Sequence, residues 1–188
     1  MRSAIRRISS AGREGKGCVV LFAAGNDTTW VSQRQLASSI DEVIIVGATN
    51  SNRDHSSYSN WGPEVDVVGP SSSGNEFPSG RRIVTSDLYG TFQGYAPGSR
   101  YTVPPDAPSF YGFGGTSSST PAVAGVCALM LTANPDLTSR EVKYLLERTA
   151  IKIPGKMRPA NYNRGGHSIF YGHGLVDAEA AVAAALGR

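Results

Sequence analysis

Two uninterrupted apolar runs constrain the fold of this chain more than any other feature of its sequence. The first covers residues 18–24 and is followed at once by Gly25, Asn26 and Asp27, and the second covers residues 43–48. Neither run alternates between apolar and polar residues, which indicates strands covered on both faces, as in a parallel sheet flanked by helices. Side chains with a chemical role in such sheets gather beyond the carboxyl ends of the strands. The sequence therefore predicts an α/β fold in which Asn26 is a candidate site residue.

Length and composition fit one globular domain. The chain has 188 residues, of which 40% are hydrophobic and 18% are charged, and its formal net charge is +3. These values suit a single sizeable core. No apolar run reaches the roughly 20 residues of a membrane span, and the amino terminus lacks the apolar core of about 7–15 residues that a signal peptide carries. We expect no membrane span and no export signal in the chain as given.

Basic residues gather near the amino terminus, at Arg2, Arg6, Arg7, Arg13 and Lys16. Such a cluster could bind nucleic acid or a membrane surface. The spacing instead favours the solvent-facing side of an amphipathic helix over residues 3–12, with Ala4, Ile5 and Ile8 on the inner side. We therefore expect no nucleic-acid partner.

The two cysteines, Cys18 and Cys127, lie in apolar surroundings and not at metal-ligand spacing. A disulfide between them is possible in principle, but the sequence does not set their separation. Buried free thiols are the favoured interpretation, and no metal ligands are assigned.

A glycine pair at positions 114–115 opens a segment of small and hydroxyl side chains that leads to Pro121. We expect a tight turn followed by a helix over residues 121–133. Because this helix is apolar nearly all round, it should lie in the middle of the core. The hydroxyls of residues 117–120 could simply cap the helix. Alternatively, a hydroxyl held at a helix amino terminus faces developing negative charge in a favourable field, which suits a nucleophile.

The residues from Gly115 onward read Gly-Thr-Ser-x-Ser-x-Pro followed by Val-Ala-Gly. This pattern resembles the nucleophile segment of the subtilisin-like serine proteases, or subtilases, and the resemblance implies that Ser117 is the nucleophile. Ser119 stands where the family usually has alanine, which exchanges one small residue for another. The esterase motif Gly-x-Ser-x-Gly is absent, which argues against an α/β-hydrolase.

Asn26 has two interpretations. An Asn-Asp pair often begins an Asx-turn, so Asn26 could be only a turn residue. The sequence Ala-Ala-Gly-Asn after a buried strand, however, resembles the oxyanion-hole segment of the subtilases. That resemblance implies that the Asn26 amide donates to the oxyanion, and that the backbone of Ala23, Ala24 and Gly25 forms one wall of the substrate pocket.

Further motifs extend the resemblance over nearly the whole chain. A Val-Gly-Ala strand at 46–48, a Tyr-Ser loop at 58–59 and an Asp-Val-x-x-Pro strand at 66–70 follow in the family's order. Residues 171–178 match its Tyr-Gly-x-Gly-x-Val-Asp-Ala segment. The resemblance implies a subtilisin-like, mostly parallel sheet flanked by helices, with residues 1–188 forming only the carboxyl-terminal portion of one catalytic domain.

A serine nucleophile needs a base, and a carboxylate that orients the base. The family's motifs for these groups, Asp-Ser/Thr-Gly and His-Gly-Thr, do not occur here. His55 lies in a polar loop after Asn26 and is expected to be a surface imidazole, whereas His167 and His173 are expected to be structural. The chain is therefore interpreted as a serine endopeptidase fragment or split gene product that is inactive alone. The alternatives are a degenerate relative that only binds peptides, and a chain that joins a second polypeptide supplying Asp and His.

The sequences of residues 51–59, 114–121 and 133–138 resemble most those of the kexin-like branch of the family. That branch cuts after basic residues with acidic, calcium-linked groups in its pocket. This chain has Asn60 where an acid is expected, and Ser32 and Gln35 supply none. Preference for basic sites is therefore not expected. No calcium ligands are assigned, although the resemblance leaves a calcium cofactor open. The resemblance also implies a polypeptide substrate and an extracellular or extracytoplasmic location.

The remaining elements are predicted from local patterns. Residues 82–86 should form a short strand that pairs with residues 111–113. Thr138 and Glu141 have capping-box spacing and should open a helix, and a last helix should cover residues 176–186. The stretches 71–80 and 90–108 are rich in Gly, Pro and Ser and should form excursions.

Overall fold

The computed structural model describes residues 2–31, 40–73, 82–88, 113–156 and 158–187. Its elements follow in the order α1 (Arg2–Ala11), β1 (Val20–Ala23), β2 (Val43–Thr49), β3 (Val67–Pro70), α2 (Thr116–Ala133), α3 (Ser139–Thr149) and α4 (Ala178–Ala185). Residues 32–39, 74–81 and 89–112 lie outside the described part, so the predictions for Ser32, Gln35, residues 111–112 and most of the two excursions fall outside it as well.

The three strands form a parallel sheet in the order β1-β2-β3. Val20 pairs with Val43, and Val46 pairs with Val67. All seven residues of β2 are buried, because the central strand is covered on both faces. This arrangement confirms the α/β prediction, and it brings the carboxyl ends of all three strands to one edge of the sheet.

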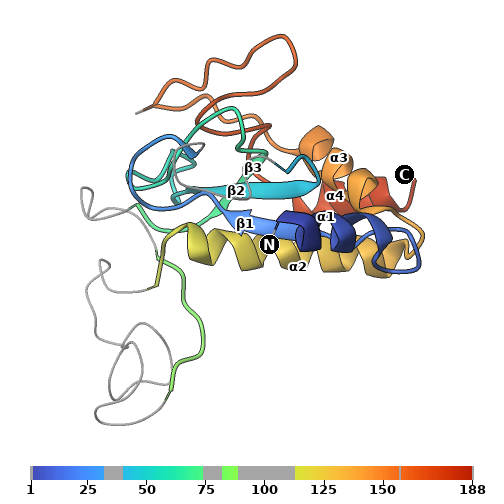
Figure 1. The fold of residues 1–188 in the computed structure, drawn as a ribbon. Coiled ribbons are helices and arrows are strands. Elements are labelled where there is room, and N and C mark those ends of the chain that lie inside the picture. Colours follow the sequence, from blue (N-terminus) through green and yellow to red (C-terminus); the bar gives the residue numbers. More distant parts are fainter. Residues whose placement is uncertain (1, 32–39, 74–81, 89–112, 157, 188) are drawn as a thin grey trace.

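Side chains of β2 alternate between two halves of the core. Ile44 and Val46 pack on the side where α2, α3 and α4 lie. Val43 and Ile45 pack on the other side, against a cluster that includes Tyr171 of the carboxyl-terminal segment. Figure 1 shows α2 running beneath β1, with α3 and α4 grouped near the carboxyl terminus and α1 beside them. The sheet is thus flanked by helices, as predicted.

Helix α2 begins five residues earlier than expected. It starts at Thr116 with Gly115 as its N-cap, so Pro121 lies inside the helix and does not open it. No side chain caps this helix, and residues 117–120, whose hydroxyls were candidate caps, lie inside it. The start is fixed by Gly115, whose φ of 94° only glycine adopts readily. Just before Pro121, the Thr120 hydroxyl donates to the Thr116 carbonyl oxygen over 2.8 Å.

Two helices are more exposed than the sequence predicts. Helix α2 was expected in the middle of the core, but one of its sides is open to solvent, and Leu129 there is 55% exposed. Of the three α1 residues expected on the inner side, only Ile5 packs against the core, whereas Ala4 is exposed and Ile8 is 47% exposed. Both predictions were wrong because no element among the described residues covers these sides.

The local predictions agree better with the structure. Thr138 and Glu141 form the complete capping box of α3. Helix α4 begins at Ala178, since the Asp177 side chain accepts from the Ala180 N–H and caps it. The exception is the predicted strand over residues 82–86, where the structure has only an isolated antiparallel bridge in which Ile83 pairs with Phe113 through hydrogen bonds of 3.0 and 3.3 Å.

Both cysteines are free thiols in the structure, with Cys127 buried and Cys18 half-buried. Burial raises the pKa of the Cys127 thiol to about 12, so it stays protonated and inert. Among the described residues, no helix is long and apolar enough to cross a membrane.

Candidate active site at the amino terminus of α2

The first turn of α2 is tied to the end of β1 through Thr116 and Asn26. The Thr116 N–H and hydroxyl donate to Asn26 Oδ1 over 2.8 and 2.9 Å. The Gly25 N–H donates to Thr116 Oγ1 over 3.2 Å. Because an N–H can face only an acceptor, these bonds fix which way the Asn26 carboxamide is turned. Its oxygen is used inside the protein, and no partner of its NH₂ group is found among the described residues.

Ser117 follows Thr116 directly and is exposed, whereas Thr116 and Ser118 on either side are buried. No hydrogen bond of the Ser117 side chain is found in the described part of the chain. The helix amino terminus adds unpaired backbone N–H groups and the positive end of the helix dipole at this position. The structure therefore brings the two sequence-predicted residues, Asn26 and Ser117, to the same turn and leaves both side chains accessible.

A group of hydroxyls holds the turn that precedes Ser117. The Gly115 N–H donates to Tyr58 Oη over 3.0 Å, and the Gly115 carbonyl accepts from Ser71 Oγ (2.9 Å) and Ser118 Oγ (2.8 Å). Tyr58 and Ser71 are bonded to each other at 2.7 Å. A Cβ on Gly115 would lie 3.2 Å from Asn26 Nδ2, so a larger residue would crowd the amide as well as strain the backbone. This role of Tyr58 was not predicted from the sequence.

Asn60 holds the segment that carries Asn26. Its Oδ1 accepts from the N–H groups of Asp27 (2.9 Å) and Thr29 (3.0 Å), and its Nδ2 donates to the Ala24 carbonyl over 3.0 Å. The Asn60 N–H donates to the Gly25 carbonyl over 3.0 Å. Asn60 is buried and fully occupied with main-chain partners. This role of Asn60 was not predicted, because no local sequence pattern reveals hydrogen bonds across more than thirty positions.

The segment of Ala23, Ala24 and Gly25, predicted as a pocket wall, has little hydrogen-bonding capacity left. The Ala24 N–H donates to the Val46 carbonyl, and its carbonyl is held by Asn60. Gly25 likewise uses its N–H and its carbonyl inside the protein. Ala24 and Gly25 can therefore contribute shape to a pocket but few hydrogen bonds.

Close packing between β3 and α2 fixes the helix beneath the site. A Cβ on Gly69 would lie 3.0 Å from the Ser119 carbonyl and 3.1 Å from a Val123 methyl group. The Ser119 hydroxyl, which replaces the family's usual alanine, is buried and donates to the Gly69 carbonyl over 3.2 Å. The exchange is thus accommodated by a hydrogen bond.

His55 is not the surface imidazole that was expected. It is only 3% exposed, and its ring makes edge contacts with Phe170 and Tyr171. Its backbone N–H donates to Asp54 Oδ1 over 2.9 Å. Burial, with a further contribution from the positive charge of Arg158, lowers the pKa of His55 to about 4. The polar loop suggested that His55 is exposed, because the aromatic residues that cover it are more than a hundred positions away in the sequence.

The other two histidines lie at the opposite end of the sheet from Ser117. His167 Nε2 is 2.8 Å from the Val65 carbonyl, just before β3, and the rings of His167 and His173 meet edge to face at 5.3 Å. His173 Nε2 is 3.8 Å from Glu147 Oε2, and burial lowers the pKa of His173 to about 4. All three histidines of the chain lie in its described part, and none of the described contacts joins one of them to Ser117.

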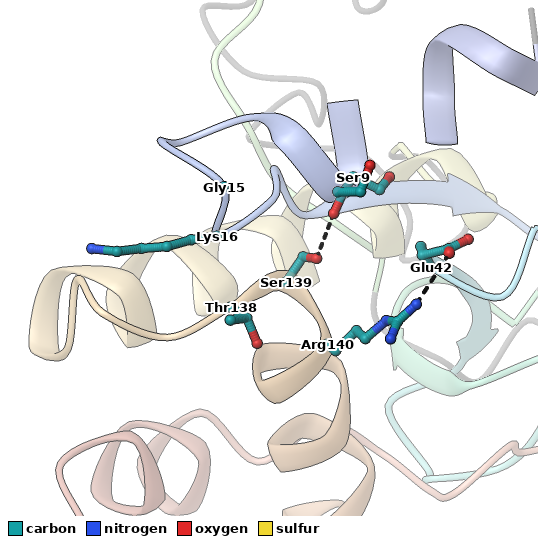
Figure 2. A pocket seen from close by; sticks show the side chains of 8 residues that line it. Ser9, Gly15, Lys16, Glu42, Thr138, Ser139 and Arg140 are labelled. Atoms are coloured by element: carbon teal, nitrogen blue, oxygen red, sulfur yellow. Dashed lines mark hydrogen bonds and ion pairs between the residues drawn. The ribbon is translucent and has the colours of Figure 1, made fainter. Parts of the chain in front are cut away.

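Neither a metal centre nor a second ligand site is found in the described part of the chain. No group of three or more His, Cys, Asp or Glu side chains in the described ranges could hold a metal ion. A pocket of about 280 Å³ lies between the end of α1 and the start of α3, and Figure 2 shows its side chains. Its cations are already paired, Lys16 with Asp136 and Arg140 with Glu42, and Ser139 Oγ donates to the Ser9 carbonyl. This pocket is best described as the joint between α1 and α3.

Residues 1–174 match the family described as the Subtilase family. The chain is 41% identical to a calcium-dependent protease of Nostoc sp. over 175 residues, which is 93% of this chain and 26% of that protein. It is 34% identical to the proprotein convertase subtilisin/kexin type 6 of Homo sapiens over 178 residues, which is 91% of this chain and 16% of the human protein.

A solved structure of a protease from Pseudoalteromonas arctica matches with a TM-score of 0.71 at 29% identity, covering 98% of this chain and 46% of the other. The chain thus spans about a quarter or less of the two curated relatives and just under half of the solved one.

Proposed function

The chain belongs to the subtilase family, and we propose that it carries the nucleophile and oxyanion side of a serine endopeptidase site. One observation supports this proposal above the others. Ser117 is exposed in the first turn of α2, directly after the residue that anchors the Asn26 carboxamide. An accessible hydroxyl, an oriented amide donor and a helix amino terminus are the groups that acyl transfer requires around the carbonyl carbon.

In the proposed reaction, Ser117 Oγ attacks the carbonyl carbon of the scissile peptide bond while a base takes its proton. The carbonyl electrons move onto the oxygen, which becomes negatively charged and accepts hydrogen bonds from Asn26 Nδ2 and from backbone N–H groups of the helix terminus. The C–N bond then breaks, and the amine leaves with the proton held by the base. Water hydrolyses the resulting ester and restores the Ser117 hydroxyl.

The general base and its carboxylate partner are proposed to come from residues outside this chain. The three histidines lie elsewhere in the fold. His55 is buried among aromatic rings, and His167 and His173 lie at the far end of the sheet. Since the pKa values of His55 and His173 are lowered to about 4, these two rings are also weak bases. The chain alone is therefore proposed to be inactive. The protein that contains it would act on polypeptides outside the cytoplasm.

Two finer expectations follow for substrate and cofactor. The Asn60 side chain is hydrogen-bonded to main-chain groups and carries no charge. We therefore propose no preference for basic residues from this position. The Nostoc relative is named for calcium dependence. We assign no calcium site to the described residues of this chain.

Labelling with a fluorophosphonate, which reacts with activated serines, tests the proposed function. The chain is mixed with a polypeptide that supplies a histidine and a carboxylate. We call it the complementing polypeptide and take it from the part of the Nostoc relative outside its 175 aligned residues. We expect rapid labelling at Ser117 in the mixture and none in the chain alone. A Ser117→Ala variant should lose the label, and a Ser10→Ala variant, which removes an exposed serine of α1, should keep it.

Two results would count against the proposal. If the mixture is not labelled at Ser117 although the polypeptide is shown to bind, the chain is a peptide-binding relative and not an enzyme. If the chain alone cleaves a peptide and the Ser117→Ala variant does not, the site is complete without a partner and the external base is wrong.

A further inference from the structure

The peptide group between Gly115 and Thr116, just before the proposed nucleophile, is hydrogen-bonded at both of its ends. Its carbonyl oxygen, on Gly115, accepts from Ser71 Oγ over 2.9 Å and from Ser118 Oγ over 2.8 Å. Its N–H, on Thr116, donates to Asn26 Oδ1 over 2.8 Å. The orientation of this peptide group therefore decides which of its two polar ends faces the Asn26 carboxamide.

Two hydroxyls join the N–H and the carbonyl of Gly115 in one closed ring of hydrogen bonds. The Gly115 N–H donates to Tyr58 Oη over 3.0 Å, and Tyr58 Oη lies 2.7 Å from Ser71 Oγ. Ser71 Oγ in turn donates to the Gly115 carbonyl. Because each hydroxyl has one hydrogen, the ring closes when Tyr58 donates to Ser71 and Ser71 donates to Gly115. Hydrogen bonds linked in this way strengthen one another in a buried site, and Ser71 is only 3% exposed.

The backbone that carries these two hydroxyls is itself fixed to the sheet and to the segment of Asn26. Ser71 directly follows β3, and its N–H donates to the carbonyl of Thr49 at the end of β2 over 2.7 Å. The Tyr58 carbonyl accepts from the N–H of Thr28, two positions after Asn26, over 3.1 Å. The two hydroxyls are thus held on a rigid edge of the fold, which is where a residue that positions a site has to be.

A peptide group that turns over exchanges the directions of its carbonyl and its N–H. Glycine permits such a turn, since it adopts positive and negative φ values about equally well, and Gly115 has a φ of 94°. The turned Gly115 carbonyl would face Asn26, whose Nδ2 is only 3.2 Å from a Cβ built on Gly115. No partner of Asn26 Nδ2 is found among the described residues, and a donor without a partner favours a bond to a nearby carbonyl. The turned peptide group would therefore bind the donor that the oxyanion needs.

We propose that Tyr58 and Ser71, which we call the hydroxyl pair, are positioning residues of the proposed site. Their hydroxyls hold the Gly115–Thr116 peptide group in the orientation that keeps Asn26 Nδ2 available to the oxyanion. Neither hydroxyl acts on the reacting atoms, because both act through Gly115. This inference rests on the proposed function, and it names the residues that keep the oxyanion donor in place.

A purely structural role of the hydroxyl pair would be to satisfy the backbone groups of a helix start that no side chain caps. The two roles differ in what they predict for Asn26. If the pair only satisfies Gly115, its loss loosens the turn and leaves the Asn26 NH₂ group as it was. If the pair orients the peptide group, its loss lets the Gly115 carbonyl accept from that NH₂ group.

The first test measures hydrogen exchange by nuclear magnetic resonance in the full chain and needs no catalysis. The double variant Tyr58→Phe/Ser71→Ala removes both hydroxyls of the pair. We expect its Gly115 N–H to exchange at least about tenfold faster than in the parent, because it loses its acceptor. The Asn26 NH₂ group should exchange about tenfold more slowly, because the turned carbonyl accepts from it. Each single variant should shift both rates in the same directions by less.

The second test measures the rate of Ser117 labelling by the fluorophosphonate in the complemented protein. The double variant should be labelled at least about tenfold more slowly than the parent, the change that roughly one lost hydrogen bond produces. In an Asn26→Asp background there is no NH₂ donor for the carbonyl to bind. The same double variant should therefore change the labelling rate less than about twofold in that background.

Tyr162 provides a matched control for Tyr58. Its Oη accepts from the Ile153 N–H over 3.0 Å, the same kind and length of bond as at Gly115, in the carboxyl-terminal segment of the chain. Tyr162→Phe should destabilise the chain about as much as Tyr58→Phe. It should leave the exchange of the Asn26 NH₂ group and the labelling of Ser117 at their parental rates.

Two outcomes would overturn the inference. The first is faster exchange at Gly115 without slower exchange at the Asn26 NH₂ group, since the hydroxyl pair would then be only structural. The second is an equal loss of labelling rate with and without Asn26→Asp. If the complemented parent is not labelled at Ser117 but both exchange rates shift as expected, the hydroxyl pair does orient the peptide group and only the proposed function fails. If the parent is labelled and the Asn26 exchange rate does not change, the proposed function stands and the inference fails.

Discussion

At the scale of single residues, the Asn26 side chain has two roles that one substitution can separate. Its oxygen anchors Thr116, and its NH₂ group is the proposed oxyanion donor. Asn26→Asp keeps an oxygen for Thr116 but removes the donor. In the complemented protein we expect the rate of Ser117 labelling to fall about 100- to 1,000-fold, the loss measured for one such donor in a subtilisin.

Stability measurements provide the control for this substitution. The free energy of unfolding of Asn26→Asp should stay near that of the parent, whereas Asn26→Ala, which removes the oxygen as well, should lower it. If Asn26→Asp labels at the parental rate, the amide is only a structural link. Urea denaturation of all three chains measures the structural part separately from the reaction.

Thr116 offers a second residue-scale test. Its buried hydroxyl donates to Asn26 Oδ1 and accepts from the Gly25 N–H. Thr116→Val keeps the shape but leaves the Gly25 N–H without that acceptor, which should lower the free energy of unfolding by about 1–3 kcal/mol. The control is Thr132→Val at the exposed end of α2, where the hydroxyl bonds only to its own helix at Ala128. Equal losses in urea denaturation would show that Thr116 is not a link between segments.

Residue-scale prediction from sequence rested on local patterns and on the resemblance to the subtilases. The end of a buried strand and a glycine-led helix start indicated Asn26 and Ser117, and the structure places both at one turn. Asn60 and Tyr58 were missed because their partners lie 31–57 positions away, and hydrogen bonds of that span leave no trace in a local pattern. The catalytic roles themselves remain predictions.

At the scale of elements, two glycines of the helix–sheet layer should respond in opposite ways to the same change. Gly125→Ala places a methyl group in open space and improves helix propensity, so it should raise the free energy of unfolding of the isolated chain by up to about 1 kcal/mol. Gly69→Ala places one 3.0 Å from the Ser119 carbonyl and should destabilise the packing of β3 on α2. Thermal unfolding measures both, and a destabilised Gly125→Ala chain would mean that this chain itself already covers that side of α2.

Elements were predicted well from periodicity and less well at their ends. Continuous apolar runs gave β1 and β2, and the capping box gave the start of α3. The start of α2 was placed at Pro121 because proline favours first turns, but Gly115 and the bonds of Thr116 fix it five residues earlier. A helix start set by contacts with another segment cannot be found from propensity alone.

At the scale of the whole molecule, acid stability should depend on the buried His55. Its pKa is lowered to about 4 from an ordinary 6.5, mainly by burial. Between these values the unfolded chain binds a proton that the folded chain does not, so His55 costs no stability above pH 6.5 and destabilises increasingly as the pH falls to 4. In His55→Phe the loss of unfolding free energy between pH 7 and pH 4.5 should be smaller than in the parent.

The comparison between two pH values cancels any packing change that the phenylalanine introduces. Two other groups titrate in a similar pH range. His173 changes stability with pH in the same direction as His55, and Glu147, whose pKa burial raises to about 7, changes it in the opposite direction. Both are present in the parent and in the variant, so only His55 differs. Parallel losses in the two chains, measured by urea denaturation, would show that His55 is not protonated on unfolding.

The overall architecture was more predictable than the surroundings of its helices. A parallel sheet flanked by helices follows from the apolar runs, because strands buried on both faces need cover on each. The exposure of α2 and α1 was not predicted, because the pattern of apolar residues in a helix does not show whether another element covers them. The exposed Leu129 and Ile8 are apolar residues of this kind.

The convergence of Asn26 and Ser117 on one carbonyl oxygen is tested most directly by a crystal structure. The complemented protein would be crystallised with a peptidyl boronate bound to Ser117 Oγ, in which a boronate oxygen takes the place of the oxyanion. We predict Asn26 Nδ2 at about 2.7–3.1 Å from that oxygen. An Asn26 amide turned away from the oxygen, or a boronate that leaves Ser117 unmodified, would contradict the assignment of both residues.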